Sequence, residues 1–196
     1  MAELSVDGRT ARRDRNRDAV LDAVLDLFAE DALEPSAVQV AERSGVSLRS
    51  VYRYFEDMDA LVRAAIERNL ERVSPLFLLD DLGQGPLAAR LERLVVSRVR
   101  LHEAVGPLMR ATILHAGENV VLAERLATVR ATMGEQVEQM FAPELDRMPA
   151  TQRRGTAAVL DQLLTFESIE HLRRVRGLSR PATVRALADS CASLLA

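Results

Sequence analysis

The sequence predicts an all-α protein of about nine helices, with a three-helix N-terminal head followed by a larger helical domain. Apolar residues recur three and four positions apart along the long segments, and no segment makes a convincing strand. Gly and Pro residues separate these segments. We therefore expect one domain over residues 1–70 and a second over residues 71–196.

The first helix is expected over residues 12–31, because its apolar residues return to one face with helical spacing. Residues 1–11 show no such periodicity and are expected to be mobile. This helix would form the scaffold for the motif that follows it. Its apolar face consists of Val20, Val24, Leu27 and Phe28.

The segment from Val40 to Phe55 predicts two short helices bent about Gly45. Ser36 and Gln39 have the spacing of a capping box, which places the start of the first helix. Gly45 can adopt the left-handed conformation that ends a helix, and the Ser47 hydroxyl can cap the second helix. Such a pair is typical of a helix-turn-helix, whose second helix enters the major groove of DNA.

The remaining elements follow from the positions of Pro, Gly and capping residues. Asp57 is expected to cap a helix that Pro75 ends, and residues 80–86 form the clearest loop. Gly106 and Pro107 are expected to close one helix and open the next. The helices of the second domain are predicted at about residues 87–105, 107–115, 119–141, 151–176 and 179–195.

The charge balance predicts no general affinity for polyanions. The chain carries 26 basic and 29 acidic residues, a formal net charge of −3, and residues 1–70 alone hold 10 Arg and 14 acidic residues. All basic residues are Arg, which suits bidentate contacts with phosphate and guanine, although a GC-rich genome explains the bias more simply. Five Arg crowd residues 9–17, whereas Asp18, Asp22, Asp26 and Glu30 follow one helix face. Binding of nucleic acid would therefore depend on where the charges lie.

The sequence lacks patterns typical of catalysis, metal binding or membrane insertion. His102, His115 and His171 do not have the spacing of a metal site, and residues 83–85 lack the Lys and Ser or Thr of a phosphate-binding loop. Cys191 lies on an apolar stripe and is interpreted as a small buried hydrophobe. No apolar run reaches the roughly 18 residues that span a bilayer. We expect a cytoplasmic protein that is not an enzyme, has no catalytic residues and uses no cofactor and no metal.

A set of residues behind the bend forms the pattern G-V-S-x-x-S-V-Y-x-Y-F, with a Leu six positions further on: Gly45, Val46, Ser47, Ser50, Val51, Tyr52, Tyr54, Phe55 and Leu61. This pattern resembles the DNA-binding domain of the tetracycline-repressor (TetR) family, over roughly residues 12–66. Two departures concern DNA contacts. Met58 stands where the family usually has a Lys that touches a phosphate, and only Ser36 remains of a Thr-rich start to the first helix of the motif.

The resemblance implies a ligand-responsive transcriptional regulator. The expected activity is repression, relieved when a small-molecule effector releases the protein from an inverted-repeat operator in double-stranded DNA. The recognition helix would contact bases and adjacent phosphates, and the start of the first helix would contact the DNA backbone. The residues expected at this interface are Arg12, Arg13, Arg15, Ser36, Ser47, Leu48, Arg49, Ser50, Tyr52, Arg53 and Tyr54.

In the resembled family the second domain surrounds a ligand cavity, and the last two helices of each subunit form a four-helix dimer interface. The resemblance therefore implies a homodimer. Residues on the corresponding helices either line the cavity or belong to the plain core: Met109, Thr112, Ile113, Met133, Phe141, Thr165 and Phe166. The C-terminal apolar stripe packs either on its own domain or on a second subunit: Val184, Leu187, Ala188, Cys191, Leu194 and Leu195.

Three other functions are considered. The protein could be a constitutive DNA-binding regulator without a ligand, or its helix-turn-helix could serve protein contact. Outward Arg49 and Arg53 on either side of Tyr52 favour DNA over protein contact. An all-α enzyme is the third possibility, but no nucleophile, base or metal cluster in the sequence supports it.

Overall fold

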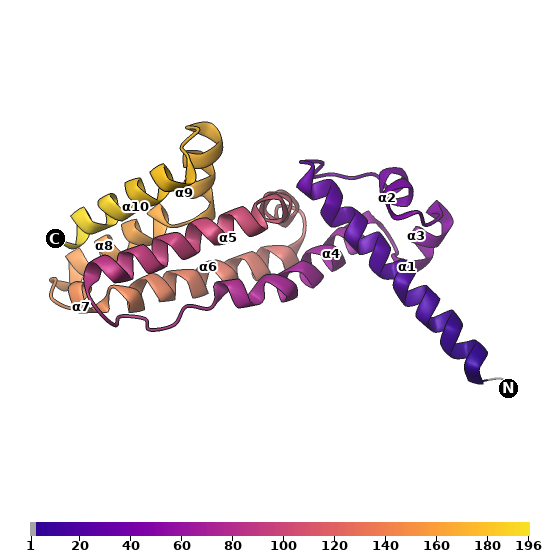
Figure 1. The fold of residues 1–196 in the computed structure, drawn as a ribbon, viewed down its shortest axis with the longest axis horizontal. Helices are drawn as coiled ribbons and strands as arrows, with labels where there is room; N and C mark the ends of the chain where they lie inside the picture. The colour runs from indigo at the N-terminus through magenta and orange to yellow at the C-terminus, as the bar shows by residue number, and fades with distance from the viewer. Residues whose placement is uncertain (1–2) are drawn as a thin grey trace. The chain divides into compact units, whose positions relative to one another are not determined.

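The computed structural model describes residues 3–196, so the first two residues of the expected 1–70 domain lie outside it. The described chain forms ten α-helices, a 3-10 turn and a π turn, and it contains no strand. The predicted all-α fold is confirmed. The chain divides into two compact units (Figure 1). The head unit comprises the chain up to Arg72 and the segment Pro107–Leu122, and the bundle unit comprises Val73–Gly106 and Ala123–Ala196.

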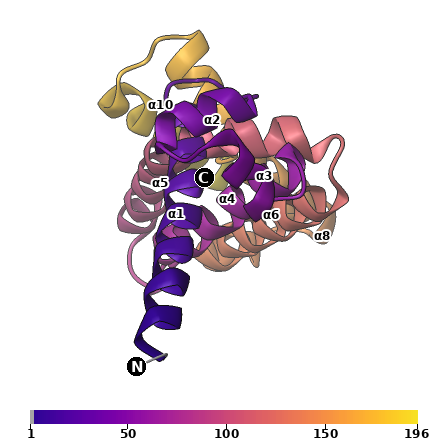
Figure 2. The same cartoon turned by 90° about the vertical axis from the view of Figure 1, so that its right-hand side faces the viewer.

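The head unit contains α1 (Glu3–Ala29), α2 (Ala37–Ser44), α3 (Leu48–Tyr54) and nearly all of α4 (Met58–Val73). Figure 2 shows α2 and α3 as a bent pair beside α1. The helix α1 begins at Glu3 rather than at about Arg12, because a polar segment can continue a helix without contributing an apolar face. Asp57 caps α4 as predicted, and its Oδ1 accepts a hydrogen bond from the Ala60 N–H at 2.7 Å.

One hydrophobic core holds the head unit together. The predicted apolar face of α1 is fully buried in this core, where it meets side chains of α3 and α4. Leu108, Ala111 and Leu122, from the segment Pro107–Leu122, complete the same core. This packing is why that segment belongs to the head unit, although it lies within the residues 71–196 expected to form the second domain.

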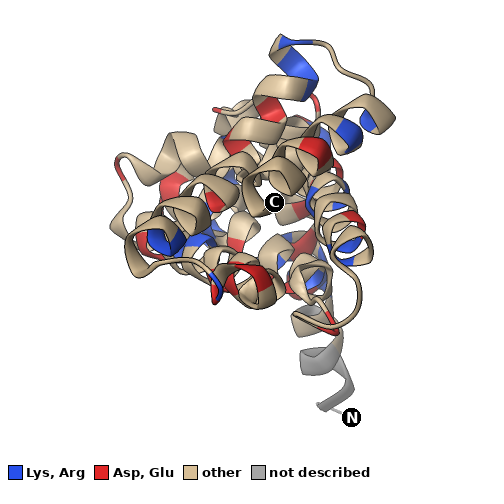
Figure 3. Ribbon diagram, turned by 90° about the vertical axis from the view of Figure 1, so that its left-hand side faces the viewer, with Lys and Arg blue, Asp and Glu red and all other residues tan. Residues whose placement is uncertain are grey.

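The bundle unit has a separate core that most of its helices share. The bundle unit begins with the 3-10 turn Ser74–Phe77 and the first two-thirds of α5 (Leu87–Ala116). The helices that follow are α6 (Val120–Met140), α7 (Ala142–Leu145), α8 (Ala150–Leu163), α9 (Phe166–Glu170) and α10 (Arg180–Leu195), with the π turn His171–Val175 before α10. Charged residues of both signs lie along these helices (Figure 3). No helix of the described residues is long and apolar enough to cross a membrane.

The prediction that Gly106 and Pro107 separate two helices is wrong, because α5 continues through both residues. Proline fixes φ near the helical value, so its main cost inside a helix is the lost hydrogen bond to the carbonyl four residues earlier and crowding against it. Buried apolar side chains on both sides of this position, Val105 and Leu108, stabilise the continuous helix. Tertiary packing thus overrides the local tendency of Gly-Pro to end a helix.

The single helix predicted at residues 151–176 is interrupted at Leu164 and Thr165. The Thr165 hydroxyl accepts a hydrogen bond from the Ser168 N–H at 3.2 Å and thereby caps a new helix, α9. A π turn then follows in place of regular α-helix. By contrast, the predicted stop before the last helix is confirmed, since Ser179 caps α10 with a 3.3 Å hydrogen bond from the Ala182 N–H.

The C-terminal stripe packs at least partly on its own protomer. Leu187, Cys191 and Leu195 are buried in the bundle core, and Val184, Ala188 and Leu194 are partly buried against it. Burial raises the pKa of the Cys191 thiol to about 11, which disfavours the thiolate. All six members of the stripe expected at a dimer interface therefore have intramolecular contacts, and three of them are buried.

A buried ion pair joins α5 to α7 inside the bundle unit. The guanidinium of Arg90 forms a bidentate contact with the Glu144 carboxylate, with one N–H to Oε2 distance of 2.8 Å. Arg90 also donates to the carbonyl oxygens of Met140 at 2.6 Å and Gly85 at 3.0 Å. Its charge and its donors are thus matched by fixed acceptors. Arg90 is a structural residue that ties the loop before α5 and the end of α6 to this helix.

Candidate nucleic-acid interface

The first helix of the bent pair begins at the predicted capping box. The Ser36 hydroxyl accepts a hydrogen bond from the Gln39 N–H at 3.3 Å, and the Ser36 N–H donates to Gln39 Oε1 at 2.8 Å. This arrangement satisfies two backbone donors that the helix start would otherwise leave unpaired. Gly45 ends the helix at φ 67° and ψ 14°, in the left-handed conformation that the sequence predicts.

A Cβ added at Gly45 would meet no atom within 4 Å apart from its immediate neighbours. The loss of stability on replacing Gly45 therefore reports the backbone conformation without a steric clash. Gly45→Ala should therefore destabilise the head unit by about 1 kcal/mol through the left-handed backbone alone. Gly155 has equally open surroundings but lies within α8, so Gly155→Ala should stabilise by about 0.5 kcal/mol. Urea unfolding of both variants measures the difference. Effects of the same sign would contradict the conformational explanation.

The second helix of the pair, α3, separates a buried face from an exposed one. Val51 and the adjoining Phe55 are buried in the head core. Leu48 and Tyr52 are 40% and 52% exposed, and Arg49 and Arg53 are also exposed. The outward face of α3 therefore presents guanidinium groups, an aromatic ring and a phenolic hydroxyl, as the helical periodicity of the sequence predicts.

Ser47 occupies the N-cap position of α3, but its predicted capping bond is absent. Its hydroxyl donates instead to the Ser50 hydroxyl at 3.0 Å. The first turn of α3 is held by backbone bonds to the Ser47 carbonyl, from the Ser50 N–H at 2.7 Å and the Val51 N–H at 3.1 Å. The side chains of Ser47 and Ser50 therefore form a small hydroxyl pair at the exposed start of the helix.

Arg53 connects this hydroxyl pair to the end of α3. Its Nη2 donates to Ser50 Oγ at 3.1 Å and to the Tyr54 hydroxyl at 3.2 Å, and its guanidinium lies 5.1 Å from the Tyr54 ring centre. The hydrogen bond from Arg53 is the main cause that lowers the pKa of Tyr54, with a second hydrogen bond from Asn16 and the charge of Arg13 adding to it. The structure thus brings Arg13 and Asn16 of α1 near the C-terminal end of α3.

The arginines expected on α1, Arg12, Arg13 and Arg15, are all exposed. Two further neighbours of the motif on the same helix are not among the residues predicted from sequence. Arg17 lies over the Phe55 ring, with its guanidinium carbon 5.1 Å from the ring centre, and Asn16 hydrogen-bonds Tyr54. The sequence does contain a signal for Arg17, because residues four positions apart on a helix share a face and Arg17 lies four positions after Arg13.

Several acidic residues of the head unit are paired with arginines away from α3. Arg43 forms a bidentate ion pair with Glu30, at 2.9 and 2.7 Å. Arg68 lies 3.4 Å from both Asp18 and Asp22. The helix α3 itself contains two Arg and no acidic residue. The outward face of α3 therefore carries positive charge, although residues 1–70 together are negatively charged.

The seven residues predicted to bind a ligand lie in both units. Met109, Thr112 and Ile113 belong to the head segment of α5, where the Thr112 hydroxyl donates to the Leu108 carbonyl at 2.8 Å. The other four belong to the bundle unit. Phe141 is fully buried in its core, Thr165 caps α9, Phe166 stacks on His102, and the Met133 carbonyl accepts a hydrogen bond from Arg98. Their role in ligand binding stays a prediction.

The bent pair α2 and α3, with its buried inner face and its exposed arginines, defines the protein as a helix-turn-helix DNA-binding protein. The family model "Bacterial regulatory proteins, tetR family" matches residues 20–65, which span the end of α1, the pair and the start of α4. The chain is 26% identical over 178 residues to the HTH-type transcriptional repressor KstR of Rhodococcus jostii (strain RHA1), covering 88% of this chain and 78% of that protein.

A solved structure has the same fold. The crystal structure of a tetR-family transcriptional regulator from Streptomyces coelicolor matches with a TM-score of 0.67 and 23% identity, over 91% of this chain and 81% of the other. The family match thus assigns the helix-turn-helix part of the chain, residues 20–65, to the tetR family of bacterial regulatory proteins, and the likeness to the solved structure shows that the chain shares the fold of a tetR-family regulator.

Proposed function

We propose that the protein is a homodimeric repressor that a small molecule releases from an inverted-repeat operator. The exposed face of α3 carries this proposal. Arg49 and Tyr52 are exposed there and are suited to base edges, whereas Ser36, Tyr54 and the α1 arginines are suited to phosphates. The similarity to a protein named as a transcriptional repressor supports repression over activation.

The dimer follows from the size of the recognition helix. A helix of seven residues covers only one short half-site, and a twofold pair places two such helices about 34 to 36 Å apart, one turn of DNA or a multiple of it. An inverted repeat has the matching symmetry. Dimerisation through the last helices would use outward-facing positions, because the inward positions of α10 already pack in the protomer core.

Ligand response is supported by the chain path. The helix α4 contributes to the head core through Ile66 and Leu70 and continues at Val73 into the bundle unit. A ligand that prefers one conformation of the bundle can therefore alter the head through this covalent connection. The coupling would be reciprocal and of order 1 to 3 kcal/mol, so operator DNA would weaken ligand binding by the same factor.

Footprinting of the DNA upstream of the gene, combined with sedimentation of the complex, tests this proposal. We expect a dimer to protect a short inverted repeat. A protected patch without twofold symmetry, occupied by a monomer, would contradict the dimer. Unchanged DNA affinity in the presence of every bound ligand would leave a constitutive regulator, and the absence of any DNA binding would favour a protein-interaction module.

A further inference from the structure

Two arginines of α5 are buried in the bundle unit, but only one has its charge neutralised. Arg90 and Arg98 are 3% and 2% exposed. Arg90 pairs with Glu144, as described above. Within the described chain no carboxylate lies within ion-pair distance of Arg98. Because a buried charge normally has a partner of opposite charge, Arg98 requires another explanation.

The hydrogen bonds of Arg98 leave one donor unused. Its Nη1 donates to Gln136 Oε1 at 2.9 Å and its Nη2 to the Met133 carbonyl at 3.0 Å, so both acceptors are neutral. Its Nε is buried and has no hydrogen-bond partner. Burial lowers the pKa of Arg98 to about 10, and the more distant charge of Asp161 opposes this effect only in part. The guanidinium thus combines an unbalanced charge with a free N–H.

A second unused nitrogen lies one helical turn further along the same face. His102 is 8% exposed, and its Nε2 lies 2.6 Å from Glu170 Oε2. Its Nδ1 is buried without a partner. The imidazole stacks on Phe166, with ring centres 4.9 Å apart, and the Phe166 side chain is only partly buried. Positions i and i+4 of a helix are neighbours, so Arg98 and His102 lie one turn apart on the same face of α5.

The composition of this region favours a monocarboxylate as the occupant. The two oxygens of a carboxylate can accept from the Nε–H of arginine and from an Nδ1–H of the imidazole, and its single charge balances that of Arg98. A phosphate would bring a further negative charge toward Asp161 and Glu170, which lie on α8 and α9 of the same unit. The Phe166 ring, which stacks on His102 and is only partly buried, provides an apolar contact beside this face.

We propose that Arg98 and His102 bind the carboxylate of a small organic acid whose apolar tail lies toward Phe166. This inference rests on the proposed function, because it names the chemical class of the effector. A polar chain links the site to the start of the bundle unit. Gln136, which accepts from Arg98, donates through its Nε2 to the Phe77 carbonyl at 2.8 Å. Phe77 ends the 3-10 turn that directly follows α4. A carboxylate that draws Arg98 away from Gln136 would loosen this attachment.

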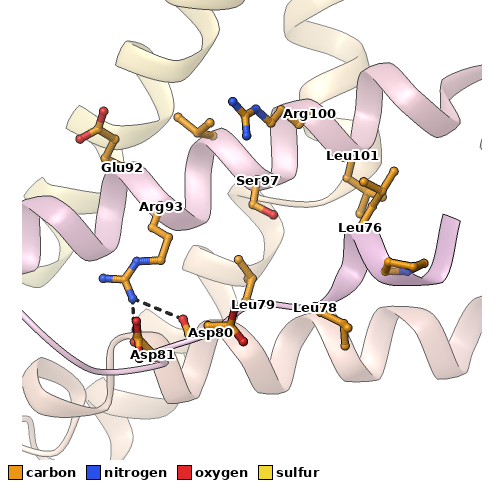
Figure 4. Close-up of a pocket in the computed structure, with 12 residues that line it drawn as sticks. Leu76, Leu78, Leu79, Asp80, Asp81, Glu92, Arg93, Ser97, Arg100 and Leu101 are labelled. Atoms are coloured by element: carbon orange, nitrogen blue, oxygen red, sulfur yellow. Dashed lines mark hydrogen bonds between the residues drawn. The ribbon is translucent and has the colours of Figure 1, made fainter.

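A groove on the outside of α5 provides the competing location for an acid. It has a volume of about 500 Å³ and lies between the segment after α4 and α5 (Figure 4). Several leucines and Arg100 line it, and Arg93 there donates to the carbonyl oxygens of Asp80 and Asp81 at 3.3 and 2.9 Å. Arg100 is exposed and lies on the same helix as Arg98, so it supplies a matched control.

The test measures binding of unbranched monocarboxylates, from acetate to octanoate, to the full-length protein by calorimetry. Primary alcohols of the same lengths are the neutral controls. We expect affinity that rises with chain length and exceeds that of the alcohols. Arg98→Met should weaken the acids at least about tenfold, whereas Arg100→Met should not. Arg98→Lys keeps the charge without the Nε–H and should lose part of the affinity, which covers the case in which Arg98→Met does not fold.

Three results would overturn the proposal. The first is a series in which no acid binds. The second is equal binding to wild type and Arg98→Met, and the third is a loss confined to Arg100→Met, which would place the acid in the outer groove. Anisotropy of labelled upstream DNA separates this inference from the proposed function. If acids bind through Arg98 but the protein stays on DNA, the acid site is retained and the proposed ligand response is disproved. If only the alcohols release DNA, the ligand response is retained and the acid site is disproved.

Discussion

Glu144→Ala should lower the free energy of unfolding of the bundle unit by about 3 to 5 kcal/mol. The substitution removes the carboxylate and leaves the guanidinium of Arg90 buried without a counter-charge. The carbonyl oxygens of Met140 and Gly85 remain as acceptors, but they cannot neutralise the charge. Urea unfolding followed by circular dichroism measures the loss.

The matched control is the exposed pair between Arg130 and Glu167, whose side chains keep about half of their accessible surface. Glu167→Ala should change stability by less than about 1 kcal/mol, because water and salt screen the pair. Losses of similar size in the two variants would show that the Arg90 pair contributes no more than a surface contact. Arg90→Met together with Glu144→Ala should recover part of the stability, since it removes the uncompensated charge.

The same pair predicts a dependence on pH. The hydrogen bond from Arg90 lowers the pKa of Glu144 below its ordinary value of 4.5, against a smaller opposing effect of burial. The folded state therefore favours the carboxylate. The stabilisation is fully present above about pH 4.5 and is lost as the pH falls through the lower pKa of the folded protein. Glu144→Gln should reduce this acid-side slope, as measured by unfolding at pH 3 to 6.

Arg49→Ala should weaken binding to the operator by about 1 to 3 kcal/mol while changing affinity for random DNA much less. Arg49 lies on the exposed face of α3, where a guanidinium can reach a guanine edge. Arg13 lies on α1 near Tyr54, at the edge of the motif, where contact with the DNA backbone is expected. Fluorescence anisotropy with operator and random duplexes measures both variants.

Arg13→Ala is the control for sequence-independent contact. It should weaken binding to all sequences alike and reduce the slope of log affinity against log salt by about 1. Equal losses on operator and random DNA for Arg49→Ala would reassign Arg49 to a phosphate. If Arg49→Ala binds the operator as tightly as the wild type does, α3 enters the groove with another face.

The features predicted well from sequence are those set by neighbouring residues. The capping box at Ser36, the left-handed Gly45, the inward Val51 and the cap at Asp57 each depend on groups within four positions, and each is present. Ser47 is the exception. Its hydroxyl donates to the Ser50 hydroxyl and makes no capping bond to the backbone.

The features that sequence did not predict depend on distant partners. Continuity of α5 through Pro107 depends on packing in two cores, and the break at Thr165 follows from one of several possible capping residues in a long apolar pattern. The difference between Arg90 and Arg98 is the clearest case. Both have similar local sequence surroundings, and only the position of Glu144, 54 residues from Arg90, distinguishes a neutralised charge from an unbalanced one.

The head unit is discontinuous in the chain, and this limits how the protein can be divided. A fragment that ends at Arg72 would contain the complete helix-turn-helix but not Leu108, Ala111 and Leu122, which cover part of its core. Such a fragment would expose an apolar surface to water and would tend to aggregate. Conversely, proteolytic cleavage in the loop at residues 80–86 would cut the chain without releasing the DNA-binding part, because the segment after the cut still packs in the head core.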